Sequence, residues 1–213
     1  VGIQNNWIQE LQVISGAFNA EYGKAQSGVV NIVTKDGPQN FGGSYSLSIG
    51  DHLSNNKNIF YSIEKVGVNE TDNNFEFHGP LGIFNSGSFL VSARLYNSSG
   101  WLFGQNRFDI DDTVPIQKYI QSAQLNITDQ ERLAGIKIPD SLNTGDGAFV
   151  PLNGKKSNSY FSKITFYPLK KLKVSYSLIY NDNKSKAYSN YRRYTPYGVP
   201  TSYQTDISQI ISF

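Results

Sequence analysis

The sequence predicts a mainly β fold, in which antiparallel strands form part of a barrel wall after a short segment of mixed α/β character. Two patterns predict it. From about residue 41 onward, apolar and polar residues alternate along six stretches, which places successive side chains on opposite faces of a sheet. The connections between these stretches alternate between long and short, as in an up-and-down meander with turns at one end and loops at the other.

Five of the stretches are complete, and the second is shorter than the others. Their predominantly apolar sets are Tyr45, Leu47 and Ile49; Phe75 and Phe77; Phe89, Val91, Ala93 and Leu95; Tyr160, Ser162, Ile164 and Phe166; and Leu172, Val174, Tyr176, Leu178 and Tyr180. The sixth stretch begins near Asp206. A short link at 79–87 and a tight turn at 168–170 alternate with long connections at about 51–72, 97–156 and 181–205.

The loop lengths favour a transmembrane barrel over a soluble protein. Long loops without regular structure are uncommon in compact soluble domains, whereas outer-membrane barrels combine short periplasmic turns with long extracellular loops. The 14 tyrosines and 13 phenylalanines suit strands with one face toward lipid. No stretch approaches the about 18 consecutive apolar residues of a membrane-spanning helix. A soluble antiparallel sandwich has the same alternation of side chains and stays open as an alternative.

Composition excludes several classes of function. The chain has no cysteine, and therefore no disulfide, thiolate metal site or thiol nucleophile. Its net charge of +2 is too small to argue for nucleic acid as a partner. No nucleophile, base and acid occur at a spacing that suggests catalysis, so we expect neither an enzyme nor a cofactor. The chain begins at Val1 and ends inside a strand-like run, and we expect it to be a fragment.

Residues 10–37 carry the most specific pattern, ELQVISGAFNAEYGKAQSGVVNIVTKDG. A strand ends in a glycine, an aromatic-Asn-Ala-Glu-Tyr-Gly segment and small residues follow, and a strand of the form Gly-Val-Val-Asn-Ile-Val-Thr-Lys comes next. This run resembles the C-terminal end of the plug domain of TonB-dependent outer-membrane receptors. It is most similar to the large receptors with an N-terminal carboxypeptidase-like regulatory domain. The residues of the plug motif are Gly16, Phe18, Asn19, Tyr22, Gly23, Gly28 and Asn31.

The resemblance implies a domain organisation and a function. Residues 1–37 correspond to the C-terminal part of the plug domain, and residues 38–213 to roughly the first six of about 22 barrel strands. The implied function is active uptake of a scarce or large nutrient across the bacterial outer membrane. The implied partners are outer-membrane lipid, an extracellular substrate that the resemblance does not identify, and the TonB complex, acting through a part of the plug outside this chain. A passive porin or structural barrel is the alternative, and a soluble β-sandwich binding module is a further one.

Three aspartates in the longest loop are candidate metal ligands. Hard cations such as calcium prefer several oxygens from a flexible loop, and Asp109, Asp111 and Asp112 lie close together in this one. Their spacing lacks the glycine and the distal glutamate of an EF-hand, and hydrated loop carboxylates are the commoner case. No metal is therefore expected.

A candidate ligand site lies in the last long loop, where Tyr191, Arg192, Arg193 and Tyr194 are consecutive. Aromatic rings stack on sugars, and arginine binds carboxylates and stacked planes. A loop stiffened by ring packing and proline is the alternative.

A third group of side chains is cationic and belongs to the predicted polar face of the strands. It comprises Arg94, Lys163, Lys171 and Lys173. These side chains are expected to contact the plug or an anionic solute, or else to remain hydrated near the membrane interface.

Overall fold

The computed structural model describes residues 3–14, 28–56, 60–63, 67–82, 87–110 and 144–213. As predicted, the protein is mainly β. The strands are β1 (Ile8–Ile14), β2 (Val29–Thr34), β3 (Gly42–Gly50), β4 (Glu70–Leu81), β5 (Gly87–Ser98), β6 (Phe103–Gln105), β7 (Phe149–Pro151), β8 (Lys155–Leu169), β9 (Leu172–Lys186) and β10 (Thr201–Ser212). Short 3-10 turns form η1 (Asn5–Trp7), η4 (Asn190–Arg192) and η5 (Pro196–Gly198). In these ranges no helix is long and apolar enough to span a membrane.

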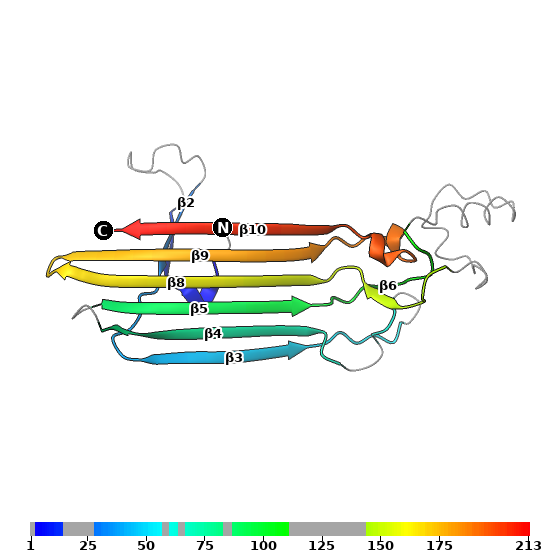
Figure 1. The fold of residues 1–213 in the computed structure, drawn as a ribbon, viewed down its shortest axis with the longest axis horizontal. Coiled ribbons are helices and arrows are strands. Elements are labelled where there is room, and N and C mark those ends of the chain that lie inside the picture. Colours follow the sequence, from blue (N-terminus) through cyan, green and yellow to red (C-terminus); the bar gives the residue numbers. More distant parts are fainter. Residues whose placement is uncertain (1–2, 15–27, 57–59, 64–66, 83–86, 111–143) are drawn as a thin grey trace, which may run out of the picture.

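Six strands form one antiparallel sheet in the order β3-β4-β5-β8-β9-β10 (Figure 1). Each strand of this sheet pairs with the strands of the sheet that come before and after it along the chain, so the sheet is a meander. The hairpin β1–β2 and the pair β6–β7 form two further small sheets. Within the described residues β3 and β10 are edge strands, so the six-stranded sheet is open and not a closed barrel.

The connections leave the six-stranded sheet asymmetrically. The strand ends that residues 51–69, 99–154 and 187–200 connect lie at one end of the sheet, and those that residues 82–86 and 170–171 connect lie at the other (Figure 1). The predicted alternation of long and short connections is therefore confirmed. We call these two ends the loop end and the turn end.

The predicted turn at 168–170 is displaced in the structure. The turn is made by residues 170–171, and Pro168 still lies within β8. The pairing of β8 with β9 shifts register between Phe166 and Leu169. Such an irregularity accommodates a residue that has no N–H to donate.

Two strands are longer than the alternation predicted. β4 has 12 residues and is not short, and β10 begins at Thr201 instead of near Asp206. The added residues are mainly polar, and backbone pairing holds them, as between Thr201 and Lys186. A search for apolar alternation cannot detect such strand ends, because backbone hydrogen bonds do not depend on side-chain polarity.

The two faces of the six-stranded sheet differ in polarity. Directly paired residues share a face, so the register assigns each side chain. The apolar face carries Tyr45, Leu47, Phe75, Phe77, Val91, Tyr160, Ile164, Tyr176, Leu178, Ile207 and Ile211. The polar face carries Ser44, Ser46, Asp72, Asn74, Glu76, Ser92, Arg94, Ser159, Lys163, Ser175, Ser177 and Asn181.

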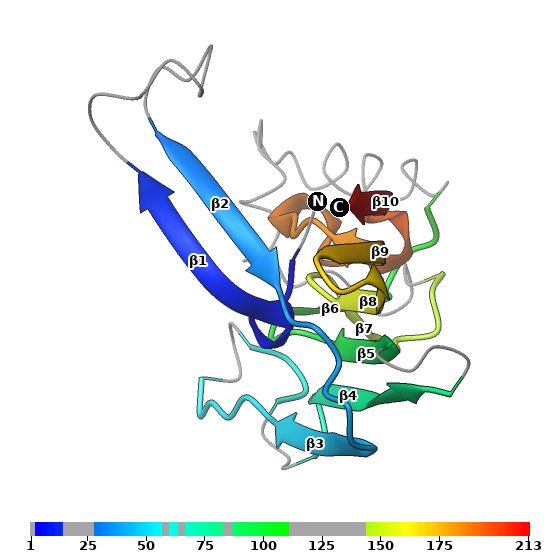
Figure 2. The ribbon, with the colours of Figure 1, turned by 90° about the vertical axis from the view of Figure 1, so that its left-hand side faces the viewer.

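The apolar face of this sheet is exposed and its polar face is buried, which is the reverse of the usual arrangement in a water-soluble sheet. On the apolar face Tyr45 is 57% exposed and Ile207 is 61% exposed, whereas Ser92 and Asn181 on the polar face are buried. The cause is the N-terminal segment (residues 3–7), which crosses the polar face before the hairpin β1–β2 stands away from the sheet on that side (Figure 2). A buried hydrophobic cluster consists of Trp7 of this segment with Leu90, Phe161 and Ile179 of the sheet.

Candidate functional site: the contact between the N-terminal segment and the polar face

Trp7 occupies a socket in the polar face. Leu90, Phe161 and Ile179 interrupt this face, and they are the residues that pack around the fully buried Trp7 ring. The ring stacks on Phe161 with a centroid distance of 5.2 Å and an interplanar angle of 20°. Its Nε1–H donates a hydrogen bond of 2.9 Å to Ser92 Oγ. The socket therefore satisfies both the apolar body and the polar edge of the indole.

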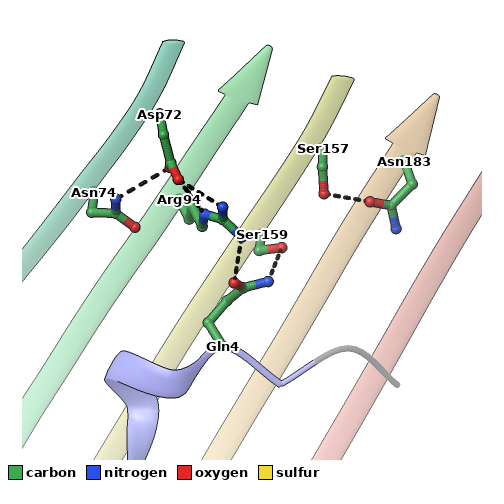
Figure 3. A network of polar contacts seen from close by, with 7 residues as sticks. All are labelled: Gln4, Asp72, Asn74, Arg94, Ser157, Ser159 and Asn183. Atoms are coloured by element: carbon green, nitrogen blue, oxygen red, sulfur yellow. Dashed lines mark hydrogen bonds and ion pairs between the residues drawn. The ribbon is translucent and has the colours of Figure 1, made fainter. Parts of the chain in front are cut away.

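Beside this socket, Arg94 connects the sheet to the N-terminal segment (Figure 3). Its guanidinium donates to both carboxylate oxygens of Asp72, with Nη2 at 2.6 Å and Nε at 2.9 Å. Nη1 donates to Gln4 Oε1 at 2.9 Å, and Gln4 Nε2 donates to Ser159 Oγ at 3.2 Å. Asn74 donates to Asp72 at 3.2 Å. A bidentate arginine–carboxylate pair is directional, so it aims the remaining N–H group at Gln4.

Asp36, which follows β2, makes a second attachment to the sheet, in addition to that of the N-terminal segment. Its carboxylate lies 2.8 Å from Lys163 Nζ and 2.5 Å from Lys173 Nζ. Lys163 is almost fully buried, and its ammonium also donates to the carbonyl and the hydroxyl of Thr34 at 3.1 Å. Thr165 Oγ1 donates to Asp36 at 3.2 Å. Burial raises the pKa of Asp36, but the hydrogen bonds and charges of the two lysines outweigh it, so the pKa is below its usual value.

The two attachments meet at the base of the hairpin β1–β2. The Lys35 N–H donates to the Trp7 carbonyl at 2.8 Å, which ties the start of the hairpin to its end. A Cβ on Gly37 would overlap the backbone carbonyl of Phe89, so only glycine permits this close approach to β5. The hairpin is thus fixed to the sheet at its base. We call Trp7, Gln4, Asp36 and their partners on the polar face the hairpin anchor.

A polar hollow of about 490 Å³ opens next to the anchor. Gln4 and Asn6 line one side, and the strands β3, β4 and β5 line the other, through Ser44, Ser46, Asp72, Asn74, Glu76 and Arg94. The hollow therefore lies between the N-terminal segment and the sheet, where any movement of that segment changes its shape.

The structure accounts for three of the four predicted cationic side chains. Arg94, Lys163 and Lys173 all contact the N-terminal segment or its continuation after β2. Lys171 lies in the turn after β8, away from this contact. No local sequence pattern singles out Trp7, Gln4 or Asp36. The signal that points to the socket is the placement of Leu90, Phe161 and Ile179 on an otherwise polar face.

Most residues of the plug motif lie outside the described residues, namely Gly16, Phe18, Asn19, Tyr22 and Gly23. Gly28 directly precedes β2, and Asn31 lies in β2, where it pairs with Gln12 of β1. Asn31 is exposed and is not part of the hairpin anchor.

The predicted ligand residues lie at the loop end. The Arg193 guanidinium lies 4.2 Å from the centroid of the Tyr61 ring, and the Arg107 guanidinium lies 5.4 Å from that of Tyr194. Arg192 lies 5.5 Å from the Tyr191 ring, which is 55% exposed. These contacts join three loops to each other, as expected if ring packing stiffens the last long loop. Their role in binding stays a prediction.

Among the candidate metal ligands, only Asp109 is described. It is exposed, and its N–H donates to Thr144 Oγ1 at 3.1 Å. Asp111 and Asp112 lie outside the described residues. In the part of the chain that is described, no group of three or more His, Cys, Asp or Glu residues could hold a metal ion.

Compared with models of known families, with curated proteins and with solved structures, the chain matches none of them.

We predict that the attachment at Asp36 weakens in acid. A carboxyl whose pKa is lowered by folding contributes its full stabilisation above the unfolded value of about 3.9, and loses it as the pH falls through the folded value. At pH 7 Asp36→Asn should cost about 1.5–3 kcal/mol, the value of a hydrogen bond to a charged group. Hydrogen-exchange protection of the Lys35 N–H should fall by about tenfold to a hundredfold.

The control is Asp51→Asn, which alters an exposed loop carboxylate that accepts hydrogen bonds from Gly67 and His52. This variant should leave protection at Lys35 unchanged. In Asp36→Asn, hydrogen-exchange protection of the Lys35 N–H, corrected for intrinsic exchange, should also no longer decrease as the pH falls from 5 into the acid range. Equal protection in wild type and Asp36→Asn at pH 7 would show that the ion pairs do not hold the hairpin.

Proposed function

We propose that this chain is part of a TonB-dependent outer-membrane transporter, with residues 1–37 in its plug and the six-stranded sheet in its barrel wall. One observation carries the proposal. The N-terminal segment packs on the polar face of the sheet, while no described residue covers the apolar face. A barrel that encloses a polar interior and turns apolar side chains toward lipid requires this arrangement.

The same observation argues against a soluble β-sandwich. In a sandwich the apolar faces of two sheets pack together and form the core. Here the buried cluster forms on the polar face, and large apolar side chains such as Ile207 and Tyr45 are exposed. Contiguous apolar surfaces of this kind are covered by a partner or by lipid. The stretch from Leu172 to Tyr180 of β9 also matches the about 9–11 residues that one crossing of a membrane by a strand needs.

The hairpin anchor favours a gated transporter over an open pore. A porin has a water-filled lumen, whereas here a segment is fixed against the polar face by Trp7, by Arg94 and Gln4, and by Asp36. Apart from the Trp7 ring, these contacts are hydrogen bonds and ion pairs, which water replaces at modest net cost. The segment can therefore be held firmly at rest and rearranged under force. The resemblance of residues 10–37 to the plug of TonB-dependent receptors supports TonB as the source of that force.

In the mechanism we propose, substrate is first captured at the loop end and then reaches the polar hollow beside the anchor. Rearrangement of the plug, driven from the other side of the membrane, opens a path along the polar face. The nutrient is scarce or large, as the resemblance implies, and its chemical class is not assigned.

The experiment is to follow the complete gene product in its native cells. We expect it in the outer-membrane fraction, and we expect growth on its nutrient to be lost both when the gene is deleted and when TonB is inactivated. Screening growth of the deletion strain on single nutrients identifies the substrate. Uptake that continues without TonB, together with steady ion conductance in planar bilayers, would identify a passive porin instead. Recovery of the protein in the soluble fraction would support the β-sandwich.

A further inference from the structure

Two exposed lysines face each other at the loop end of the apolar face. Lys156 of β8 is directly paired with Lys184 of β9, so both side chains project from the same face of the sheet. The register continues this row to Asn97 of β5 and to Tyr203 of β10. The Lys184 ammonium lies 5.3 Å from the centroid of the Tyr203 ring. We call Asn97, Lys156, Lys184 and Tyr203 the lysine row.

Among the described residues, neither lysine of this row forms an ion pair. Like charges directly opposite each other destabilise a pair of strands. Among the described residues, the ion pairs of the sheet involve Arg94, Lys163 and Lys173, all of which contact acids on the side of the polar face. Asp182 lies on the same face, two residues before Lys184, but it forms no ion pair with Lys156 or Lys184. The lysine row is therefore a cationic site that an external anion would stabilise.

Its position relative to the apolar face indicates which anion. Tyr160 and Tyr180 are directly paired, with ring centroids 6.0 Å apart, and they are the last aromatic pair before the row. Lys156 precedes Tyr160 by about 13 Å along the strand, which is about 9 Å along the membrane normal for a strand tilted by about 45°. The headgroup layer on each side of a bilayer is about 5–8 Å thick. With Tyr160 and Tyr180 at the membrane interface, the backbone of the row lies just outside the headgroup layer, and the long lysine side chains reach back to the depth of lipid phosphates.

We propose that the lysine row binds the phosphate of an anionic lipid in the leaflet at the loop end. The inference rests on the proposed function, because it requires the apolar face to lie in lipid. Neighbouring strands are about 4.8 Å apart, so the two ammonium groups can contact one phosphate together, with the Asn97 amide as a further donor. The acyl chains of the same lipid then cover the apolar face below the row. This added hydrophobic contact selects a lipid over free phosphate.

The test uses the complete protein, purified in mild detergent and titrated with phosphatidylglycerol in native mass spectrometry. The loop-end variant Lys156→Gln/Lys184→Gln should bind this lipid about 30-fold more weakly than wild type, the equivalent of about 1 kcal/mol per lysine. The matched control is Lys170→Gln/Lys171→Gln, which removes the same charge at the turn end and should bind as wild type does. Lys156→Arg/Lys184→Arg keeps the charge and should retain most of the binding.

Three results would overturn the inference. Unchanged lipid binding in the loop-end variant would show that the lysine row is not the binding site. An equal loss of binding in the turn-end variant would show that the lipid is held by non-specific charge attraction. Competition by inorganic phosphate as effective as that by phosphatidylglycerol would identify a site for free anions. Failure of the proposed function is seen separately, because wild-type protein would then be missing from the outer-membrane fraction whatever the lysines bind.

Discussion

Replacement of Trp7 by alanine is expected to detach the N-terminal segment from the sheet. The ring is fully buried, stacks on Phe161 and donates to Ser92. Truncation of a buried tryptophan to alanine costs about 3–5 kcal/mol, because the transfer free energy is lost and a cavity remains. Hydrogen-exchange protection of β1, and of the Lys35 N–H that donates to the Trp7 carbonyl, should fall by about a hundredfold or more.

Two variants show whether this loss arises from the socket. Trp101→Ala makes the same change at the other tryptophan, which is 48% exposed in a loop, and it should leave protection of β1 unchanged. Trp7→Phe keeps an aromatic ring against Phe161 but loses the hydrogen bond to Ser92, so it should cost about 1 kcal/mol from that bond. If Trp7→Ala lowered protection no more than Trp101→Ala, the hairpin would have to be held by other contacts.

Introduction of a charge on the apolar face is expected to block assembly in the membrane, whereas the same charge one residue earlier is tolerated. Ile211 pairs with Tyr176 on the apolar face, and Ile210 pairs with Ser177 on the polar face. Both side chains are exposed in the described part of the chain, at 60% and 45%. A lysine in contact with lipid at mid-depth costs about 2–4 kcal/mol, and a lysine in a polar lumen costs little.

The pair Ile210→Lys and Ile211→Lys is closely matched, because residue type, substitution and strand are identical. The amount of folded protein in the outer-membrane fraction should drop severalfold for Ile211→Lys only. The opposite order would show that the polar face is the one in contact with lipid, and equal amounts of the two variants would argue against a membrane-embedded sheet.

Much of the sheet could be predicted because period-two alternation is a local property. The sets beginning at Tyr45, Phe89 and Tyr160 each identify one face of one strand without reference to any other. Strand ends were predicted less well. The first residues of β10 are polar and are held by pairing with β9, as Thr201 is with Lys186, and such pairing depends on a neighbour that the local pattern does not contain.

The hairpin anchor could not be predicted from local patterns in the sequence. Asp36 and Lys163 are separated by more than half of the chain, yet their charged groups are 2.8 Å apart. Nothing in the residues around Asp36 distinguishes it from a hydrated loop carboxylate. The cluster around Arg193 is a second case. Its residues were predicted from their composition, but the contact of Arg193 with Tyr61 joins two different loops.

Local patterns of residues were enough to predict that this protein is mainly β, that its strands have one apolar and one polar face, and that long and short connections alternate. These properties follow from side-chain alternation and turn residues, which act over a few positions. The packing of the N-terminal segment on the polar face, with Trp7 in a socket of Leu90, Phe161 and Ile179, becomes visible only in the folded chain. Burial and ion pairing depend on which strands become neighbours, and the register of the whole sheet sets that arrangement.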